Sequence, residues 1–469
     1  MKKTMYLAAC SLLFLAACSE PKTVDTENPI LTIEGGQVQG VLLEDDVIAY
    51  KGVPFAAVPV GELRWKKPQP VTPWDTVMVA SEFKNAAWQA AHDPNDGNYG
   101  TEFFAQDAPF SEDCLHVNIW TPKTAAGKTD AKLPVALWIH GGAYTGGWSF
   151  EPEMDGEAWA ERGVILVTAN YRLGIFGYLN HPLLTEEGEG HSGNYGTYDQ
   201  VAALKWVYNN IAQFGGDPEN ITVFGQSAGA ASIKNLVTSP LSKGMVKKAI
   251  IQSIGGISSV LQETATQEEL DAKAKAKLEE AGITTLEQMR AASYEQLAEI
   301  FKSAWGDPNA VRFSPHTDGV LLTEDFTTAA FNNTLADVPY MMGHCANDMP
   351  GLGNGEQRFA EVRDSLSQQP TYLYFFDRPL PTDGRPALKG SFHSSELWYT
   401  FHTLKRSWRP FTEADEELSN RMVDYWTNFC KFGNPNGETE GEWQKSTKEN
   451  PFCMTLAVKE AEAEAPAAE

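Results

Sequence analysis

The chain has 469 residues, of which 42% are hydrophobic and 11% aromatic, enough to build a substantial buried core. Its formal net charge is −25, with 62 acidic against 37 basic residues. This excess of acidic groups disfavours nucleic acid and anionic membrane surfaces as partners. The sequence contains no internal repeat, phosphate-binding glycine loop or cluster of metal ligands, so we expect no cofactor and no metal.

The N-terminus resembles an export signal. Lys2 and Lys3 precede an apolar stretch that is too short to span a bilayer and ends in Leu15-Ala16-Ala17-Cys18. This ending resembles a bacterial lipobox and predicts cleavage before Cys18, with lipid attached to Cys18. A simple secretory signal with an accidental cysteine is the alternative. Residues 1–17 are thus a predicted lipoprotein signal peptide and 18–29 a flexible tether, which predicts a protein anchored to the lipid bilayer of the bacterial cell envelope.

From residue 30 onward, strand-like and helical segments alternate, which predicts a single α/β domain over residues 30–457 with a mainly parallel central sheet flanked by helices. The segment 262–304, rich in Glu, Lys and Ala, breaks this alternation and is expected to form a helical cap over the mouth of the site. Residues 458–469 form an expected acidic, solvated tail. Short strands are expected between Ile30 and Tyr50, later strands at Pro134–Ile139, Val164–Asn170, Ile221–Phe224, Lys248–Ser253, Val338–Gly343 and Thr371–Phe376, and helices at Tyr198–Phe214 and Glu413–Phe432.

The segment Gly225-Gln226-Ser227-Ala228-Gly229-Ala230 follows the expected strand Ile221–Phe224. Two glycines flank Ser227 at the spacing of a nucleophile elbow, in which a strand turns sharply into a helix. An ordinary glycine-rich turn is the simpler alternative. The elbow interpretation makes Ser227 the candidate nucleophile of a hydrolase.

A second motif lies at the end of the expected strand Pro134–Ile139 and consists of Trp138-Ile139-His140-Gly141-Gly142-Ala143-Tyr144. Small residues here let main-chain N–H groups approach the oxyanion that forms during acyl transfer. The expected donors are the N–H groups of Gly142, Ala143 and Ala228.

A serine nucleophile needs a histidine base and a carboxylate that orients it. His393 follows the strand-like run at Thr371–Phe376 and is the expected base among the four histidines downstream of Ser227, which also include His316, His344 and His402. Asp348 follows the preceding strand and is the expected acid. Spacing alone leaves other carboxylates open, namely Asp318, Glu324 and Asp325.

Several further blocks occur in a characteristic order: Tyr50–Ala56, Pro59–Trp65, Ser111–Asn118, Asn170–Gly174, Gly193–Gly196 and Phe214–Pro218. With these blocks, the chain from about Leu31 to about Leu456 resembles type B carboxylesterases of the α/β-hydrolase fold, a family that includes cholinesterases and bacterial esterases. The resemblance implies the triad Ser227, His393 and Asp348, the oxyanion hole above, and two structural ion pairs, Arg64 with Glu112 and Arg172 with Asp199.

The chain departs from the family pattern at three positions. The family commonly has glutamate where this chain has Gln226 and Asp348. Trp88 stands where the family has a cysteine that pairs with the equivalent of Cys114, so Cys114 is expected to be a buried apolar residue. A bridge between Cys430 and Cys453 is left open, because the sequence does not give their separation.

The predicted activity is hydrolysis of small, aromatic or apolar carboxylic esters through an acyl-enzyme. A binding or adhesion module on the same fold, and a serine amidase or peptidase, are the alternatives. Several aromatic residues are in segments that could line the pocket, although core packing is the default for most of them: Trp88, Phe103, Phe104, Tyr144, Trp148, Trp305 and Trp398.

Overall fold

The structure is a computed structural model that describes residues 28–458, except 105–107, 258–264, 304–309 and 440. The predicted signal peptide, Cys18, Trp305, most of the tether and nearly all of the acidic tail lie outside the described residues. Among the residues that are described, no helix combines the length and the apolar character needed to cross a bilayer.

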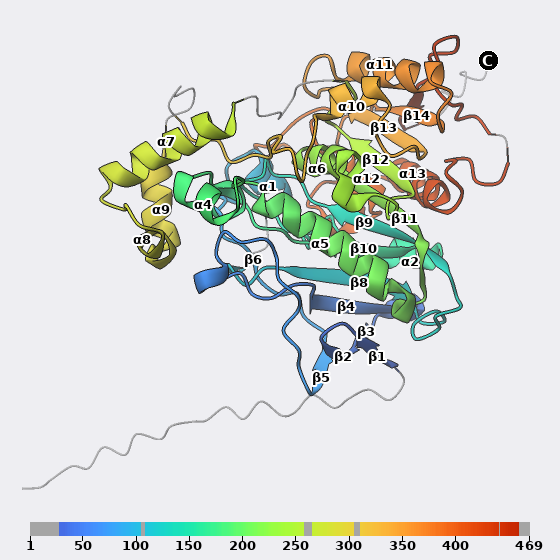
Figure 1. Ribbon diagram of the computed structural model, residues 1–469. Helices are drawn as coiled ribbons and strands as arrows, with labels where there is room; N and C mark the ends of the chain where they lie inside the picture. Colours follow the sequence, from blue (N-terminus) through green and yellow to red (C-terminus); the bar gives the residue numbers. More distant parts are fainter. Residues whose placement is uncertain (1–27, 105–107, 258–264, 304–309, 440, 459–469) are drawn as a thin grey trace, which may run out of the picture.

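In the described residues, a ten-stranded sheet forms the centre of the molecule (Figure 1). Neighbouring strands are parallel from β15 to β10 and antiparallel from β10 to β3. The predicted α/β architecture with a mainly parallel sheet is confirmed. In spatial order the strands are β15 (Met454–Leu456), β14 (Thr371–Phe376), β13 (Tyr340–Cys345), β12 (Lys248–Gln252), β11 (Gly216–Gln226), β9 (Leu133–Ile139), β10 (Ile165–Ala169), β8 (His116–Pro122), β4 (Val47–Pro54) and β3 (Val41–Leu42).

Helices cover both faces of the sheet, because the central strands are apolar on both sides. In β9, Val135 and Leu137 belong to one core and Ala136 and Trp138 to the other. The alternation follows from the two-residue period of a strand. The first core includes residues of α5 (Tyr195–Asn210), α6 (Ala228–Thr238), α10 (Phe326–Asn332) and α11 (Leu352–Ser365). The second includes residues of α2 (Glu157–Glu161), α12 (Leu397–Thr400) and α13 (Glu413–Phe432).

Several predicted elements have different bounds in the structure. Strand β11 extends over Gly216–Gln226, because it continues alongside β9 on both sides of the predicted apolar run. Strand β13 lies two residues further along the chain than predicted, at Tyr340–Cys345. The helix predicted from Tyr198 begins at Tyr195, and its last turn, Ile211–Phe214, is a 3₁₀ helix.

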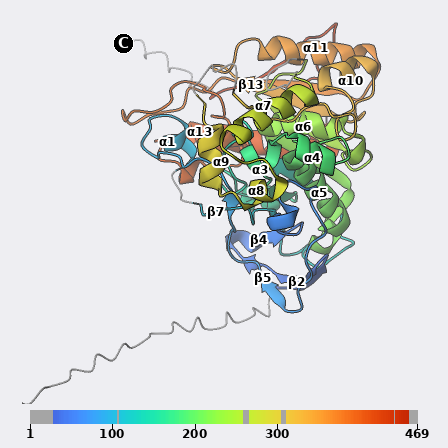
Figure 2. The ribbon, with the colours of Figure 1, turned by 60° about the vertical axis from the view of Figure 1, so that its left-hand side comes forward.

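The segment expected to form a cap is helical in the described residues, as α7 (Gln267–Glu280), α8 (Leu286–Ala291) and α9 (Tyr294–Phe301). These helices share an apolar cluster with α3 (Gly174–Tyr178) and α4 (Pro182–Glu187). Figure 2 shows α7, α8 and α9 in front of the sheet beside α3 and α4. The remaining elements are a sheet of β1 (Ile30–Ile33), β2 (Gly36–Gln39) and β5 (Val77–Val79), the pair β6 (Ala86–Ala87) and β7 (Phe110–Ser111), and α1 (Tyr99–Phe103).

Candidate active site

The predicted nucleophile lies at the carboxyl end of a central strand. Strand β11 ends at Gln226 and helix α6 begins at Ala228, so the chain turns sharply at Ser227. Ser227 has φ 57° and ψ −125°, a conformation that a non-glycine residue adopts only under strain. The surrounding structure therefore holds this residue in a fixed conformation, as in a nucleophile elbow.

The two glycines of the elbow are explained by close packing against β9. A Cβ atom on Gly229 would lie 2.0 Å from the carbonyl oxygen of Ile139. On Gly225 it would lie 2.6 Å from the carbonyl carbon of Gly229 and 2.7 Å from the Ile139 oxygen. No side chain fits at either distance, so glycine at both positions is what allows α6 to start directly beside β9.

The predicted oxyanion loop follows β9 at the same edge of the sheet. Gly142 has φ +98°, and a Cβ atom there would lie 2.1 Å from the carbonyl oxygen of Gly146. In the part of the chain that the structure describes, the N–H groups of Gly142 and Ala143 donate to no main-chain carbonyl, and both residues line the cavity that contains Ser227. Ala228 is the first residue of α6, so its N–H has no partner within the helix. All three N–H groups are available to a ligand atom.

The histidine and aspartate predicted from the sequence are in contact. Nδ1 of His393 lies 2.7 Å from Oδ1 of Asp348, and the Asp348 side chain is fully buried. Asp348 follows β13 and His393 follows β14, which are neighbouring parallel strands. Asn347 ties the two loops together: its N–H donates to the carbonyl of Ser391 at 2.9 Å, and its side-chain oxygen accepts from the N–H of Ser391 at 3.0 Å.

The local charges favour an ionised aspartate and stabilise a proton on the neighbouring histidine. Burial opposes ionisation of Asp348, but hydrogen bonds and charge from His393, with further hydrogen bonds from Ser253 and Met349, lower its pKa below the ordinary value. Burial would lower the pKa of His393, whereas the hydrogen bond and charge of Asp348 and the charge of Glu396 raise it overall. A neutral His393 that donates Nδ1–H to Asp348 has its lone pair on Nε2, the nitrogen that acts as base in this arrangement.

The other carboxylates that spacing left open are engaged elsewhere. Oδ1 of Asp318 accepts three main-chain N–H groups of its own turn, at 2.8 to 3.0 Å. Glu324 binds the side chain of Asn332, and Asp325 caps helix α10. The other downstream histidines also have different partners: His316 contacts Gln267, His344 contacts Glu356 and His402 contacts Ser419. Geometry therefore singles out Asp348.

One contact of the histidine was not anticipated. Nε2 of Gln226 lies 3.3 Å from Nε2 of His393, and Gln226 is buried. With Nδ1–H held by Asp348, the amide of Gln226 is the donor and the imidazole the acceptor in this contact. The sequence did mark Gln226 as a departure from the family pattern, but it did not indicate which atom the side chain would reach.

A cavity of about 700 Å³ opens over Ser227 and His393. Of the aromatic residues predicted to line it, Trp88, Phe103 and Phe104 do so. Tyr144, Trp148 and Trp398 do not line it and are buried in the core, which was the default expectation for most of these residues. The aromatic lining is completed by Tyr99, Tyr294, Phe301 and Phe313.

Aromatic stacking occupies the place where the family pattern has a disulfide. Trp88 stacks on Tyr294 of cap helix α9, with ring centroids 4.9 Å apart and planes 12° from parallel. Cys114 is buried and unpaired, as predicted. All four described cysteines are free, so Cys430 and Cys453 form no bridge with each other.

Both ion pairs implied by the family resemblance are present. Nε of Arg64 donates to Glu112 at 2.8 Å, and Arg64 also donates to the carbonyls of Arg290 and Ala292 next to the cap. Nε and Nη2 of Arg172 each donate to Asp199 at 2.8 Å, and both side chains are buried. The two pairs fix the loops that precede the elbow.

Sequence reasoning missed a pair of buried carboxyl groups in the cavity wall, Glu151 and Glu153. Burial raises the pKa of Glu151 to about 7 and that of Glu153 well above its ordinary range. Nothing in a single sequence indicated this arrangement, because a Glu-Pro-Glu segment is usually solvated.

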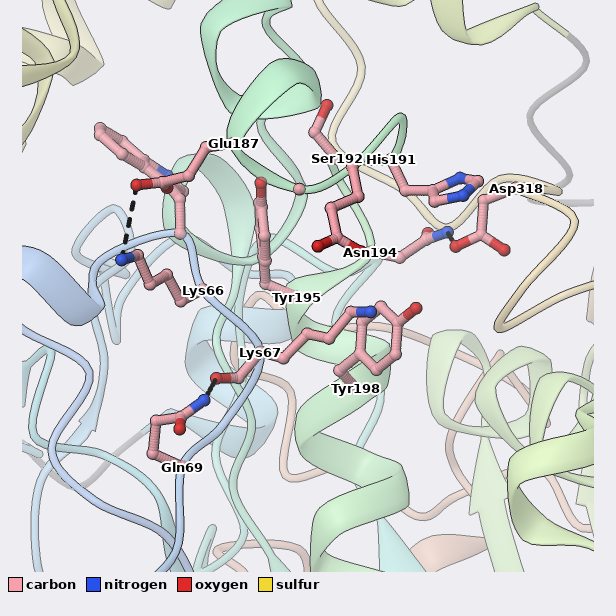
Figure 3. Close-up of a pocket in the computed structure, with 13 residues that line it drawn as sticks. Lys66, Lys67, Gln69, Glu187, His191, Ser192, Asn194, Tyr195, Tyr198 and Asp318 are labelled. Atoms are coloured by element: carbon pink, nitrogen blue, oxygen red, sulfur yellow. Dashed lines mark hydrogen bonds and ion pairs between the residues drawn. The ribbon is translucent and has the colours of Figure 1, made fainter.

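A second cavity, of about 280 Å³, lies apart from this site and is lined by none of the three predicted triad residues. Figure 3 shows that its polar side chains largely contact one another. Lys66 pairs with Glu187 at 3.4 Å, and the amide of Asn194 donates to Asp318 at 3.0 Å. These groups are structural partners, and no part of the predicted chemistry lies there.

The protein has the features that define an α/β-hydrolase. Its sheet is mainly parallel, a serine elbow follows a central strand, and a histidine and a carboxylate lie in loops after later strands. A model of the carboxylesterase family matches residues 27–354 and 351–468. The chain therefore belongs to the carboxylesterase family and is a carboxylic ester hydrolase.

Individual relatives agree with this assignment. Para-nitrobenzyl esterase of Bacillus subtilis (strain 168) is 33% identical over 468 residues, covering 87% of this chain and 91% of that protein. Fumonisin B1 esterase of Sphingopyxis macrogoltabida is 45% identical over 244 residues, which are 51% of this chain but only 43% of that relative. Among solved structures, a PNB esterase superimposes with a TM-score of 0.78 at 29% identity, covering 91% of this chain and 95% of that one. A carboxylesterase of Geobacillus stearothermophilus gives 0.76 at 30% identity, covering 92% and 96%.

Proposed function

We propose that the enzyme hydrolyses small, aromatic or apolar esters, with Ser227 as nucleophile, His393 as base and then acid, and Asp348 as the orienting carboxylate. The observation that carries these roles is the 2.7 Å contact between His393 and Asp348, at the same edge of the sheet as the elbow. The aromatic lining of the 700 Å³ cavity supports apolar or aromatic substituents on the substrate.

In the first half-reaction, Ser227 Oγ attacks the ester carbonyl carbon while Nε2 of His393 takes the hydroxyl proton. The carbonyl oxygen becomes an oxyanion, which the N–H groups of Gly142, Ala143 and Ala228 stabilise. Loss of one such donor costs about 3–4 kcal/mol in comparable sites. When the intermediate collapses, the C–O bond to the alcohol breaks and His393 gives its proton to the departing alcohol.

In the second half-reaction, water replaces the alcohol and His393 removes its proton as the water attacks the acyl-enzyme. The same N–H groups stabilise the second oxyanion. Release of the carboxylic acid restores Ser227. Throughout the cycle, Asp348 stabilises the transient imidazolium and keeps Nδ1–H pointing toward itself.

The proposal extends to location. Export is supported by Lys2 and Lys3 before the apolar stretch. Cleavage before Cys18 and lipid attachment at that cysteine are supported by the ending Leu15-Ala16-Ala17-Cys18. A lipid anchor would hold the catalytic domain at the bilayer of a bacterial envelope. Metabolic labelling with a fatty-acid analogue tests this: we expect label in the wild-type protein and none in Cys18→Ser.

The central test is Ser227→Ala. The hydroxyl is the proposed nucleophile, and loss of the nucleophile in related triads lowers the turnover number by up to about a million-fold. We expect no burst of nitrophenol from p-nitrophenyl acetate, with an unchanged circular dichroism spectrum. Retention of more than a few per cent of turnover would refute the assignment. Ester and amide versions of one substrate, tested side by side, separate an esterase from an amidase.

A further inference from the structure

The wall of the active-site cavity contains two carboxyl groups with very few hydrogen-bond donors. Glu151 is 6% exposed and Glu153 is 0% exposed, and both line the cavity. Oε1 of Glu151 accepts the main-chain N–H of Trp148 at 2.8 Å. Among the described residues, the carboxyl oxygens of Glu153 have no hydrogen-bond partner of good geometry, and only its own main-chain N–H and a proton shared with Glu151 act on them. A buried carboxyl without a donor is costly and calls for a ligand or a shared proton.

The neighbouring cations are already paired. Arg409 binds Glu102 at 2.7 Å with both side chains buried, and Arg406 binds Asp155 at 2.8 Å. The other ionisable groups near the pair among the described residues are Glu102, Tyr171 and the buried ring of His140, and burial lowers the pKa of His140 to about 4, so none of them brings positive charge near neutrality. The protein therefore supplies two acidic groups at this part of the cavity and leaves the balancing cation to come from elsewhere.

Building on the proposed esterase function, we propose that Glu151 and Glu153 form a specificity subsite for a protonated amine carried by the alcohol half of the ester. An ammonium group has N–H donors and a positive charge, which are the two things the pair lacks. Glu151 is the partly exposed member and makes the direct contact. Glu153 lies behind it and, in its protonated form, donates a hydrogen bond to the Glu151 carboxylate.

The position of the pair selects the alcohol half of the substrate. The hydroxyl of Thr403 donates to the carbonyl of Glu153 at 2.9 Å, and the indole of Trp398 donates to Glu102 at 3.0 Å. Thr403 belongs to the segment that follows His393, and Ser394 and Leu397 of that segment line the same cavity, so the pair lies on the histidine side of the cavity. His393 protonates the leaving alcohol, which must therefore occupy that side.

The subsite has a built-in pH dependence. Burial raises the pKa of Glu151 to about 7, and burial with the charge of Glu151 raises that of Glu153 well beyond its usual range. Near neutrality Glu153 keeps its proton and Glu151 ionises, so the negative charge appears as pH rises from 6 to 8. A secondary alkylamine remains protonated over that interval, much as lysine does. Preference for a cationic ester should therefore increase with pH.

The test compares piperidin-4-yl acetate with cyclohexyl acetate, which have nearly the same shape but differ in charge. For the wild type at pH 8 we expect the cationic ester to have the higher kcat/KM, and we expect the ratio of the two values to fall at pH 6. Titration of His393 affects both esters and cancels in the ratio. In Glu151→Gln the ratio at pH 8 should fall about tenfold or more, the usual effect of losing a hydrogen bond to a charged group. Glu157→Gln, on the same segment but outside the cavity, should leave the ratio unchanged.

A wild-type ratio that is near one and flat from pH 6 to 8 would overturn the subsite while leaving the esterase proposal intact, and this measurement needs no variant. An unchanged ratio in a folded Glu151→Gln protein would do the same. If the wild type hydrolyses neither ester faster than Ser227→Ala, the proposed function itself fails and the subsite fails with it. Glu153→Gln provides a second variant, expected to lower the ratio by a smaller factor than Glu151→Gln.

Discussion

Replacing Asp348 with asparagine tests the catalytic arrangement most directly, because it removes one charge and keeps the shape of the side chain. Asp348 is fully buried, with Oδ1 2.7 Å from Nδ1 of His393 and 2.8 Å from the N–H of Met349. Asparagine can keep its oxygen at this position only by turning its NH₂ group toward the N–H of Cys345, which Oδ2 now accepts at 3.4 Å. The reverse orientation places NH₂ against His393. Each orientation loses the charge; the first creates one conflict between donors, at Cys345, and the second creates two, at His393 and Met349.

The size of the effect follows from the distance between the charges. At an effective dielectric constant of about 20, opposite unit charges about 4 Å apart attract each other by about 4 kcal/mol. Loss of that attraction for the imidazolium corresponds to about a thousand-fold lower turnover number. In some enzyme molecules His393 would carry its proton on Nε2 instead of Nδ1, and such molecules can increase the loss of turnover number to about ten-thousand-fold.

The assay is steady-state hydrolysis of p-nitrophenyl acetate, with kcat and KM determined separately and folding checked by circular dichroism. We expect kcat to fall by three to four orders of magnitude, in line with the loss derived above, and KM to change little. The charge of Asp348 contributes to the raised pKa of His393, so the acid limb of the pH–rate profile should move to lower pH in the variant. Asp318→Asn is the control, because Asp318 binds only its own turn and Asn194. A loss of less than about tenfold in Asp348→Asn, or an equal loss in Asp318→Asn, would refute the reasoning.

Three further outcomes follow. Arg172→Leu leaves Asp199 buried without its partner and should lower the free energy of unfolding in urea by about 3–5 kcal/mol. Arg385→Ala breaks an exposed pair and should change the free energy of unfolding far less. Gln226→Glu places a negative charge beside Nε2 of His393 and should raise the pKa of the acid limb by about one unit; an unchanged limb would contradict the contact. Burial raises the pKa of Glu151 from 4.5 to about 7, so the folded protein favours the protonated carboxyl. The contribution of this group to the free energy of unfolding is therefore fully present below pH 4.5 and is lost as pH rises through 7. Denaturation of Glu151→Gln should therefore show a gain of roughly 3 kcal/mol over the wild type at pH 8 and little gain at pH 5.

The parts of the site that could be predicted from sequence are those specified by short local segments. The elbow around Ser227 and the loop at Gly142 need glycines because a Cβ atom at Gly225, Gly229 or Gly142 would lie less than 3 Å from main-chain atoms, and this requirement appears directly in the sequence. His393 and Asp348 lie 45 residues apart, and only the expectation that β13 and β14 are neighbours brings them together. That expectation came from the alternation of strands and helices and from the family resemblance.

The lining of the cavity could not be predicted in the same way. Trp148 and Tyr144 lie within a few residues of the oxyanion loop, yet both point into packed regions, while Tyr294 comes from a cap helix and lines the cavity. The direction of a loop side chain depends on which other segment offers it a partner. Trp88 illustrates this: the sequence marked it as a replaced cysteine and as a candidate pocket residue, but it could not indicate its stacking partner, Tyr294, which is far along the chain.

The two kinds of residue also differ in what they contribute. The proposed triad lies at the carboxyl edge of the sheet, where adjacent parallel strands fix the separations of its members, so the reaction type can be inferred from a few motifs. The groups that distinguish one ester from another come from loops, the cap and the segment around Glu151, and their positions depend on contacts between distant parts of the chain. Glu153 would be unfavourable in a cavity that accepted only neutral, apolar esters, because burial of a carboxyl is costly and a leucine would pack there without that cost. Its presence is therefore a stronger indication of substrate charge than the surrounding aromatic rings are of substrate shape.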